Sequence, residues 1–316
     1  MWIFDANLDA EARWAGGALP KQIAERVSPL AALCAALAPD GVAPSEIEIW
    51  APAAVDPARL AGWPGKAPAM RAGTPPRADA RWAQDRARDV NDRNFALALA
   101  GELGCALPGA RAIASLDELA AHLAAGGAAA SPTRGWVCKA PLTTAGRDRV
   151  FGTGDAIPGD ARALLASHGA LVFEPWLDRT LDAATCGTVT ARGAIELLPS
   201  HRLLSSPRGA FRGIDLDFHD DQLAPVAARA GEALARAGYV GPFGVDAFRY
   251  RTGGGERWHP LCEINARYTF GHVAHALART LGARSLHVGP RSALPPAGAD
   301  ARILVTPAPL GAWLLR

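Results

Sequence analysis

Three polar side chains alternate with apolar ones in the segment PLCEINAR, where Glu263, Asn265 and Arg267 flank Ile264 and Ala266. Alternate side chains of a β-strand point to opposite faces of its sheet. We therefore expect a carboxylate, an amide and a guanidinium in a row on one face. Carboxylate and amide oxygens are hard ligands that suit Mg²⁺, which completes its coordination with water and phosphate oxygens. A structural ion pair between Glu263 and Arg267 would explain the same pattern.

A second acidic strand, FGVDAFRY, precedes this segment and is joined to it by the turn RTGGGER. If the two strands form an antiparallel hairpin, Asp246 and Glu263 meet on one face with Asn265 beside them. These oxygens could bind Mg²⁺, and Arg267 could then face a phosphoryl group or an oxyanion.

Lysine is rare in this chain, which contains only Lys21, Lys66 and Lys139, while all other basic residues are arginines. Single arginines therefore carry little functional information, and each lysine carries more. Lys139 lies inside the predicted strand WVCKAP, where a buried ammonium is costly without an anion. It either binds an anion or belongs to an edge strand and extends to water.

Two segments after this lysine could contact a nucleotide. The loop LTTAGRDR has small and hydroxyl residues that let backbone N–H groups approach phosphate oxygens, although an ordinary hairpin turn would look similar. The segment VFEPWL places an acid and an aromatic ring at a strand exit, where backbone groups could hold a planar base. A strand that ends at a proline turn is the alternative interpretation.

Composition excludes some classes of function. The 316 residues carry a formal net charge of +2, so no global charge attracts nucleic acid or an anionic membrane. The five cysteines are far apart and form no CxxC pair, which predicts reduced thiols in a cytoplasmic protein. We expect no signal peptide, because the N-terminal segment lacks a basic region, and no membrane span, because no apolar run is long enough.

Hydrophobic periodicity predicts a small α/β unit over about the first 90 residues. A segment rich in Pro and Gly, residues 62–79, is predicted to be a loop or linker. Beyond it, a helix is expected over 94–103, and helices then alternate with antiparallel strands, which favours an α+β fold. Residues 200–217 are predicted to be a long connection.

The order of these segments resembles the ATP-grasp superfamily of ADP-forming carboxylate–amine ligases. The resemblance covers about residues 88–282, and its most specific part is E-x-N-x-R after an Asp-bearing strand. It implies an ATP-grasp fold, in which two α+β subdomains (91–170 and 171–316) clasp ATP within a domain over 91–316. A small α/β pre-grasp domain over 1–90 would precede it.

The resemblance also implies roles for individual residues. Arg93 and Lys139 would bind phosphates, and Arg93 stands where many members have lysine. The other nucleotide-binding residues would be Thr143, Thr144, Ala145, Gly146, Glu174, Pro175, Trp176, Leu177 and Asp182. Asp246, Glu263 and Asn265 would bind Mg²⁺, which Mn²⁺ could replace. Arg267 and Lys139 would be catalytic, with Arg267 steadying an acyl phosphate.

The implied reaction joins a small-molecule carboxylate to an amine through an acyl phosphate, with release of ADP and phosphate. An ATP-grasp kinase, a non-catalytic nucleotide-binding protein and a histidine-based metallohydrolase are the alternatives. No nucleic acid or membrane partner is expected, and the chain could form a homodimer.

The sequence indicates substrate-binding residues less clearly than nucleotide-binding ones. Arg202, Arg208 and Arg212 could hold a substrate carboxylate, or they could belong to a solvated loop. His272 and His275 lie three residues apart on a predicted helix, which suits a zinc site. Because no third ligand has suitable spacing, we expect one of them to pack or hydrogen-bond instead.

Overall fold

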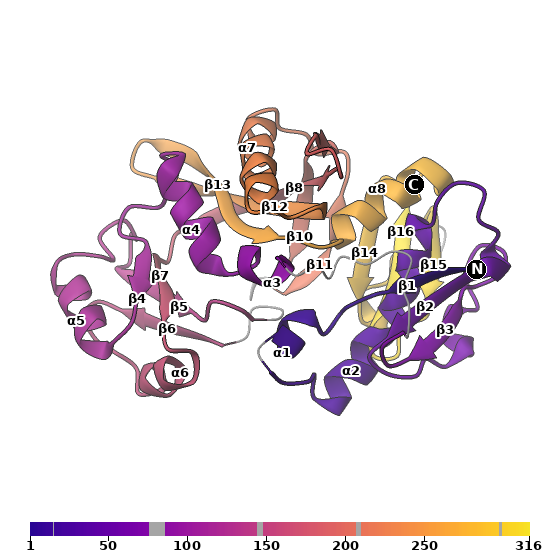
Figure 1. Cartoon of the computed structure of the whole chain (residues 1–316), viewed down its shortest axis with the longest axis horizontal. Helices are drawn as coiled ribbons and strands as arrows, with labels where there is room; N and C mark the ends of the chain where they lie inside the picture. The colour runs from indigo at the N-terminus through magenta and orange to yellow at the C-terminus, as the bar shows by residue number, and fades with distance from the viewer. Residues whose placement is uncertain (15, 76–85, 144–147, 207–209, 297–298) are drawn as a thin grey trace. The chain divides into compact units, whose positions relative to one another are not determined.

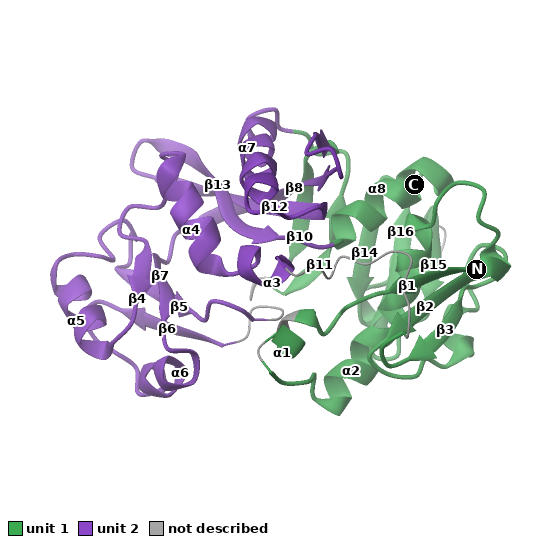
Figure 2. Ribbon diagram, in the orientation of Figure 1, with its two compact units in different colours: residues 1–84, 198–219, 268–316 green, residues 85–197, 220–267 purple. Residues whose placement is uncertain are grey.

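The computed structural model describes residues 1–316 except 15, 76–85, 144–147, 207–209 and 297–298. The chain divides into two compact units, each built from separate segments (Figure 2). Unit 1 comprises residues 1–84, 198–219 and 268–316, and unit 2 comprises residues 85–197 and 220–267. This division follows packing, so the predicted domain boundaries at residues 90 and 170 stay a prediction.

Unit 1 contains a parallel sheet of three strands in the order β1-β2-β3 and an antiparallel set in the order β10-β11-β14-β16-β15 (Figure 1). Its strands are β1 (Trp2–Asp5), β2 (Ile47–Ala51), β3 (Ala69–Ala72), β10 (His201–Ser205), β11 (Phe211–Asp215), β14 (Ser285–Gly289), β15 (Ala301–Val305) and β16 (Gly311–Leu315). Its helices are α1 (Ala10–Trp14), α2 (Lys21–Val27) and α8 (Phe270–Leu281), with 3-10 helices at Ser28–Leu37, Pro44–Glu46, Pro57–Leu60 and Arg291–Ala293.

The core of unit 1 joins distant parts of the chain. Leu30 and Leu33 from the 3-10 helix Ser28–Leu37 lie in one apolar cluster with Leu304 of β15 and Leu314 of β16. Pro29 is the reason that the apolar run 21–37 is not one α-helix, because proline is tolerated in the first turn of a helix but not in its interior.

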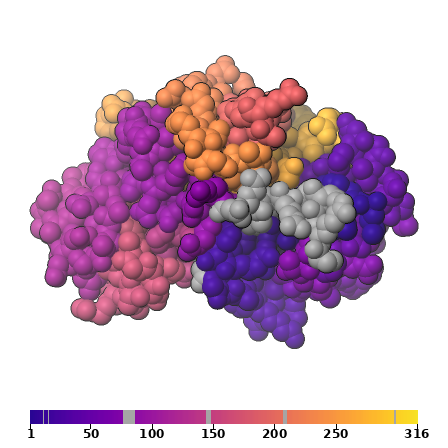
Figure 3. All heavy atoms as spheres, in the orientation of Figure 1, coloured from indigo at the N-terminus to yellow at the C-terminus, as the bar shows by residue number. Residues whose placement is uncertain are grey.

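Unit 2 contains two antiparallel sheets (Figure 1). The first has the strand order β4-β7-β5-β6, and the second has β13-β12-β8 with β9 paired to β8. Figure 3 shows side chains of α4, in purple, and α7, in orange, at the surface of this unit. The strands are β4 (Arg111–Ile113), β5 (Gly135–Lys139), β6 (Arg149–Thr153), β7 (Leu171–Pro175), β8 (Arg179–Val189), β9 (Ile195–Leu197), β12 (Gly241–Thr252) and β13 (Gly255–Asn265). The helices are α3 (Ala87–Val90), α4 (Arg93–Glu102), α5 (Leu116–Ala124), α6 (Asp160–His168) and α7 (Leu223–Arg236).

Capping residues set where the helices of unit 2 begin. The Asp92 side chain accepts a hydrogen bond from the backbone N–H of Asn94 at 2.7 Å, so α4 begins at Arg93. Ser115 accepts from the N–H of Glu118 at 3.1 Å, which fixes the start of α5. The predicted helix over 94–103 is therefore confirmed to within one residue at each end.

Two predictions of irregular structure were wrong. The predicted loop 62–79 contains β3, which is mostly exposed and pairs with β2 through its backbone, so its side chains give no alternating signal. The predicted long connection 200–217 is instead a hairpin of β10 and β11 with a register shift between Leu204 and Ser205. Such a shift breaks the period of two on which strand prediction relies.

Candidate functional site

The predicted acidic hairpin is present in unit 2. Asp246 of β12 and Glu263 of β13 are direct register partners in the antiparallel pair. The Asn265 amide donates a hydrogen bond to the Asp246 carboxylate at 3.2 Å. Two carboxylates and one amide therefore lie together at one end of the hairpin, as the alternation predicted.

An irregular register in this hairpin separates the site from the turn. Phe248 pairs with His259, and Asp246 pairs with Glu263, so β13 has two more residues than β12 between these pairs. Pro260 lies in this stretch and cannot donate a ladder hydrogen bond. Irregularities of this kind redirect side chains next to functional sites.

Burial and the neighbouring carboxylate of Glu263 raise the pKa of Asp246 to about 7. A cation between the two carboxylates would reverse this effect, because it stabilises their charged forms. The described residues contain no group of three or more His, Cys, Asp or Glu side chains that could hold a metal ion. The set of Asp246, Glu263 and Asn265 has two carboxylates and an amide, which suits a hard cation that keeps water and phosphate ligands.

The guanidinium of Arg93, at the first position of α4, forms an ion pair with Glu263 at 2.8 Å. The same guanidinium donates to the carbonyl oxygen of Ala140 at 2.7 Å and to Oγ1 of Thr143 at 2.9 Å. Arg267 donates to Oδ1 of Asn265 at 2.8 Å. Sequence reasoning placed Arg93 at a phosphate and did not anticipate its contact with Glu263.

Lys139 has an anionic partner within the protein. Its Nζ lies 2.6 Å from Oε2 of Glu174, and the two side chains are only 15% and 9% exposed. Burial raises the pKa of Glu174, but Lys139 outweighs burial, and the pKa of this carboxyl is lowered overall. In the structure the Lys139 ammonium thus has a carboxylate partner within the protein, and its predicted contact with phosphates stays a prediction.

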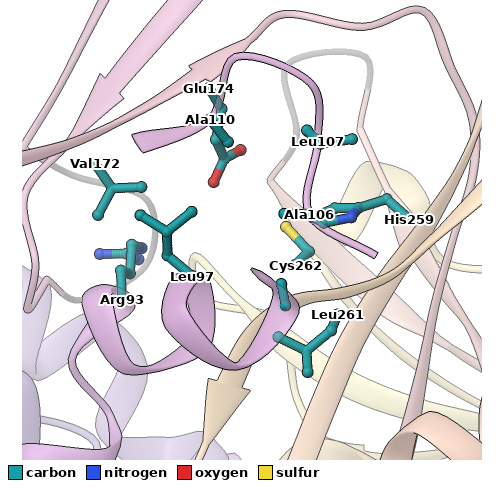
Figure 4. Close-up of a pocket in the computed structure, with 11 residues that line it drawn as sticks. Arg93, Leu97, Ala106, Leu107, Ala110, Val172, Glu174, His259, Leu261 and Cys262 are labelled. Atoms are coloured by element: carbon teal, nitrogen blue, oxygen red, sulfur yellow. The ribbon is translucent and has the colours of Figure 1, made fainter. Parts of the chain in front are cut away.

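A narrow cavity of about 20 Å³ lies beside these ion pairs (Figure 4). A cavity needs about 10–15 Å³ to hold one water molecule, so a nucleotide would require it to open. Its lining includes Arg93 and Leu97 of α4, Val172 and Glu174 of β7, and Leu261 and Cys262 of β13. Burial raises the pKa of Cys262 to about 11, so this thiol is not a nucleophile at neutral pH.

The segment after β7 places aromatic and charged groups near the same elements. Leu177 is buried against Leu107 and Phe248, whereas Trp176 is 39% exposed. The guanidinium of Arg179 lies 3.8 Å above the Phe248 ring and 3.6 Å from Asp182. Sequence reasoning missed Arg179 and Phe248 because arginine is abundant in this chain and a single Phe in a strand predicts only core packing.

The remaining predicted residues fall into two groups. Thr144, Ala145, Gly146 and Arg208 lie outside the described residues. Arg202 is exposed on β10 and Arg212 is half-buried on β11, both in unit 1. Their roles stay predictions, as does that of Pro175 at the end of β7.

The two predicted histidines of α8 make hydrogen bonds. His272 accepts from the backbone N–H of Thr269 at 3.1 Å and so caps the helix. His275 lies 3.1 Å from the carbonyl oxygen of Pro199 and 3.4 Å from the ring of His201. Burial and the neighbouring His275 lower the pKa of His201 to about 3. Sequence spacing could not reveal His201, which is 74 residues from His275.

The N5-carboxyaminoimidazole ribonucleotide synthetase from Thermus thermophilus matches with a TM-score of 0.54 and 13% identity, over 99% of this chain and 92% of that chain. That synthetase has the ATP-grasp fold. This chain has the ATP-grasp fold. The predicted fold class is thereby confirmed.

A second match to this ATP-grasp chain is a biotin carboxylase–β,γ-ATP complex from Campylobacter jejuni, with a TM-score of 0.52 and 12% identity over 72% of this chain and 63% of that chain. A carboxyaminoimidazole synthetase from Staphylococcus aureus, complexed with ADP, has a TM-score of 0.48 and 12% identity, and covers 60% of this chain. The chain spans about half of that protein, 48% of its length. No family model and no curated protein matches the sequence. In the described part of the chain, no helix is both long and apolar enough to cross a membrane.

Proposed function

We propose that this ATP-grasp protein is an ATP-dependent ligase that joins a small-molecule carboxylate to an amine. The observation that supports it most directly is the pairing of Asp246 with Glu263 beside Asn265 on one hairpin of that fold. Two carboxylates and an amide suit a cation that also binds phosphate oxygens. Lys139 and Arg93 supply positive charge in the same unit.

The proposed reaction has two steps. The substrate carboxylate attacks the γ-phosphorus of ATP, and the bond to the β,γ-bridging oxygen breaks, which gives an acyl phosphate and ADP. The amine then attacks the acyl carbon, loses a proton, and releases phosphate. Phosphoryl transfer chiefly requires positioning and electrostatic stabilisation, so no protein nucleophile is needed.

The residues have distinct roles in this proposal. Asp246, Glu263 and Asn265 would hold Mg²⁺, or Mn²⁺ in its place, which neutralises phosphate charge when bound. Lys139 would contact the phosphates, and Arg267, already oriented by Asn265, would stabilise charge on the acyl phosphate. Glu174, Trp176 and Leu177 would bracket the base. These roles, the cytoplasmic location and a homodimer are parts of the proposal.

A second candidate is a nucleotide-binding protein without ligase activity. Both candidate phosphate ligands, Lys139 and Arg93, form ion pairs within the protein, and the cavity beside them holds little more than one water. A binding protein could retain these pairs without performing any chemistry.

Hydroxylamine trapping distinguishes these candidates. The protein would be incubated with ATP, Mg²⁺ and a panel of carboxylates in the presence of hydroxylamine, and the hydroxamate product and ADP would be measured. A hydroxamate that depends on ATP and on one carboxylate is the expected result. Binding of ATP without ADP release for any carboxylate of the panel would support the second candidate.

A further inference from the structure

Arg93 connects three parts of unit 2. Its side chain is 9% exposed, and its guanidinium contacts Glu263 of β13 at 2.8 Å. It also contacts Ala140 and Thr143 in the segment that leads to the predicted phosphate loop, at 2.7 and 2.9 Å. The planar fork of a guanidinium can donate to all three oxygens at once, whereas a lysine ammonium is a compact point charge.

The contact with Glu263 affects the predicted cation site directly. A divalent cation at Asp246, Glu263 and Asn265 would need the same carboxylate that Arg93 contacts. The guanidinium and a cation bound to the same carboxylate would repel each other, and the burial of Arg93 limits the screening of this repulsion by water.

We propose that Arg93 closes the cation site of the nucleotide-free protein. A divalent cation then binds Asp246, Glu263 and Asn265 only together with a polyphosphate, whose oxygens replace Glu263 as the partner of the guanidinium. This inference rests on the proposed function, because it takes the three residues as the cation site. It also explains why this position has arginine, because a lysine could not contact Glu263, Ala140 and Thr143 at the same time.

Manganese binding without nucleotide tests this proposal. Electron paramagnetic resonance measures free Mn²⁺ as the metal is titrated into wild-type protein, Arg93→Met and the double variant Arg93→Met/Glu263→Gln. We expect Arg93→Met to bind Mn²⁺ at least about tenfold more tightly than wild type, because a charge repulsion has been removed. The gain should disappear in the double variant, which lacks the freed carboxylate.

Lys139→Met is the matched control. It also removes a largely buried cation from unit 2, but that cation is paired with Glu174 and not with Glu263. Its gain in Mn²⁺ affinity should be clearly smaller than that of Arg93→Met. An equal gain in the control, or no gain in folded Arg93→Met, would overturn the proposal.

Two further measurements keep the test decisive. Circular dichroism establishes that each variant is folded, and if Arg93→Met is not, Arg93→Lys replaces it. We then expect an intermediate gain, because the ammonium cannot make all three contacts, and an unchanged affinity would overturn the proposal. Binding of an ATP analogue with Mn²⁺ to wild type is measured in parallel. Its absence would reject the proposed function, whereas its presence without a gain in Arg93→Met would reject this inference alone.

Discussion

Asp246 and Glu263 are register partners across β12 and β13, and each carboxylate has a different environment. Both side chains are half-buried, but the Asp246 carboxylate accepts a hydrogen bond from the Asn265 amide, whereas Glu263 is paired with the guanidinium of Arg93. This asymmetry means that equivalent carboxylate-to-amide substitutions at the two positions should not behave alike.

Asp246→Asn should remove Mg²⁺-dependent nucleotide binding while preserving stability. Desolvation and the charge of Glu263 disfavour the ionised Asp246 carboxylate, as its raised pKa indicates. Replacing it with a neutral amide should therefore leave the free energy of unfolding at pH 8 the same or increase it. Glu263→Gln should also remove binding, but it leaves the buried guanidinium of Arg93 without its anion and should destabilise the fold. Thermal shift with ADP, with and without Mg²⁺, and urea unfolding measure the two effects. A normal Mg²⁺-dependent shift in Asp246→Asn would contradict the metal-site assignment.

The buried pair of Lys139 and Glu174 should show strong coupling in a double-mutant cycle. Removing one partner of a buried ion pair costs about 3–5 kcal/mol, because it leaves the other charge unpaired. We expect Lys139→Met and Glu174→Gln each to destabilise the protein, and the double variant to cost less than the sum of the two. Urea unfolding at pH 7.5 measures the cycle. Simple additivity would show that the two side chains do not interact in solution.

Lys139→Met should also weaken nucleotide binding, if this side chain contacts phosphates. Lys66→Met is the control, because it removes the same charge from an exposed lysine of unit 1 that has no role in the proposed site. Fluorescent ATP displacement measures both affinities. An unchanged affinity in Lys139→Met would exclude this lysine from the site.

His201 should make unit 1 sensitive to acid. Its folded-state pKa of about 3 lies below the ordinary value of 6.5, so between these values the unfolded chain binds a proton that the native protein does not. The contribution of His201 to the free energy of unfolding is therefore fully present above about pH 6.5. It decreases as the pH falls toward 3, by a few kcal/mol at most. His201→Gln should reduce the difference in unfolding free energy between pH 7.5 and pH 5. An unchanged difference would mean that His201 is not the responsible group.

Gly152 of β6 should tolerate no side chain. A Cβ at this position would lie 2.1 Å from the ring of Trp136, which is fully buried on the neighbouring strand β5. Gly152→Ala should cost about 1–3 kcal/mol, because a packed core accommodates extra volume poorly. Gly253→Ala is the control, since no atom lies within 4 Å of the added carbon. Equal stability of the two variants would contradict this packing.

Local patterns predicted the elements of this fold better than they predicted its contacts. The hairpin of Asp246 and Glu263 was predictable because a short glycine-rich turn joins two alternating strands. The partner of Glu263 was not, because Arg93 is 170 residues away in sequence. In the sequence alone, where this partner is not visible, no property of Arg93 distinguishes it from the many other arginines of the chain. Lys139 was noticed because lysine is rare, but its pairing with Glu174 depends on the order of strands β5 and β7, which alternation does not specify.

Unit 1 is made of three separated segments, and this arrangement has a consequence for synthesis on the ribosome. Leu30 and Leu33 find their core partners in Leu304 and Leu314, which are translated after the whole of unit 2. Domains usually fold in the order in which they emerge. Leu30 and Leu33 of the first segment therefore lack these core partners while unit 2, within residues 85–267, is translated and folds. Nascent chains should therefore need chaperone protection of the first segment until the last strands are released.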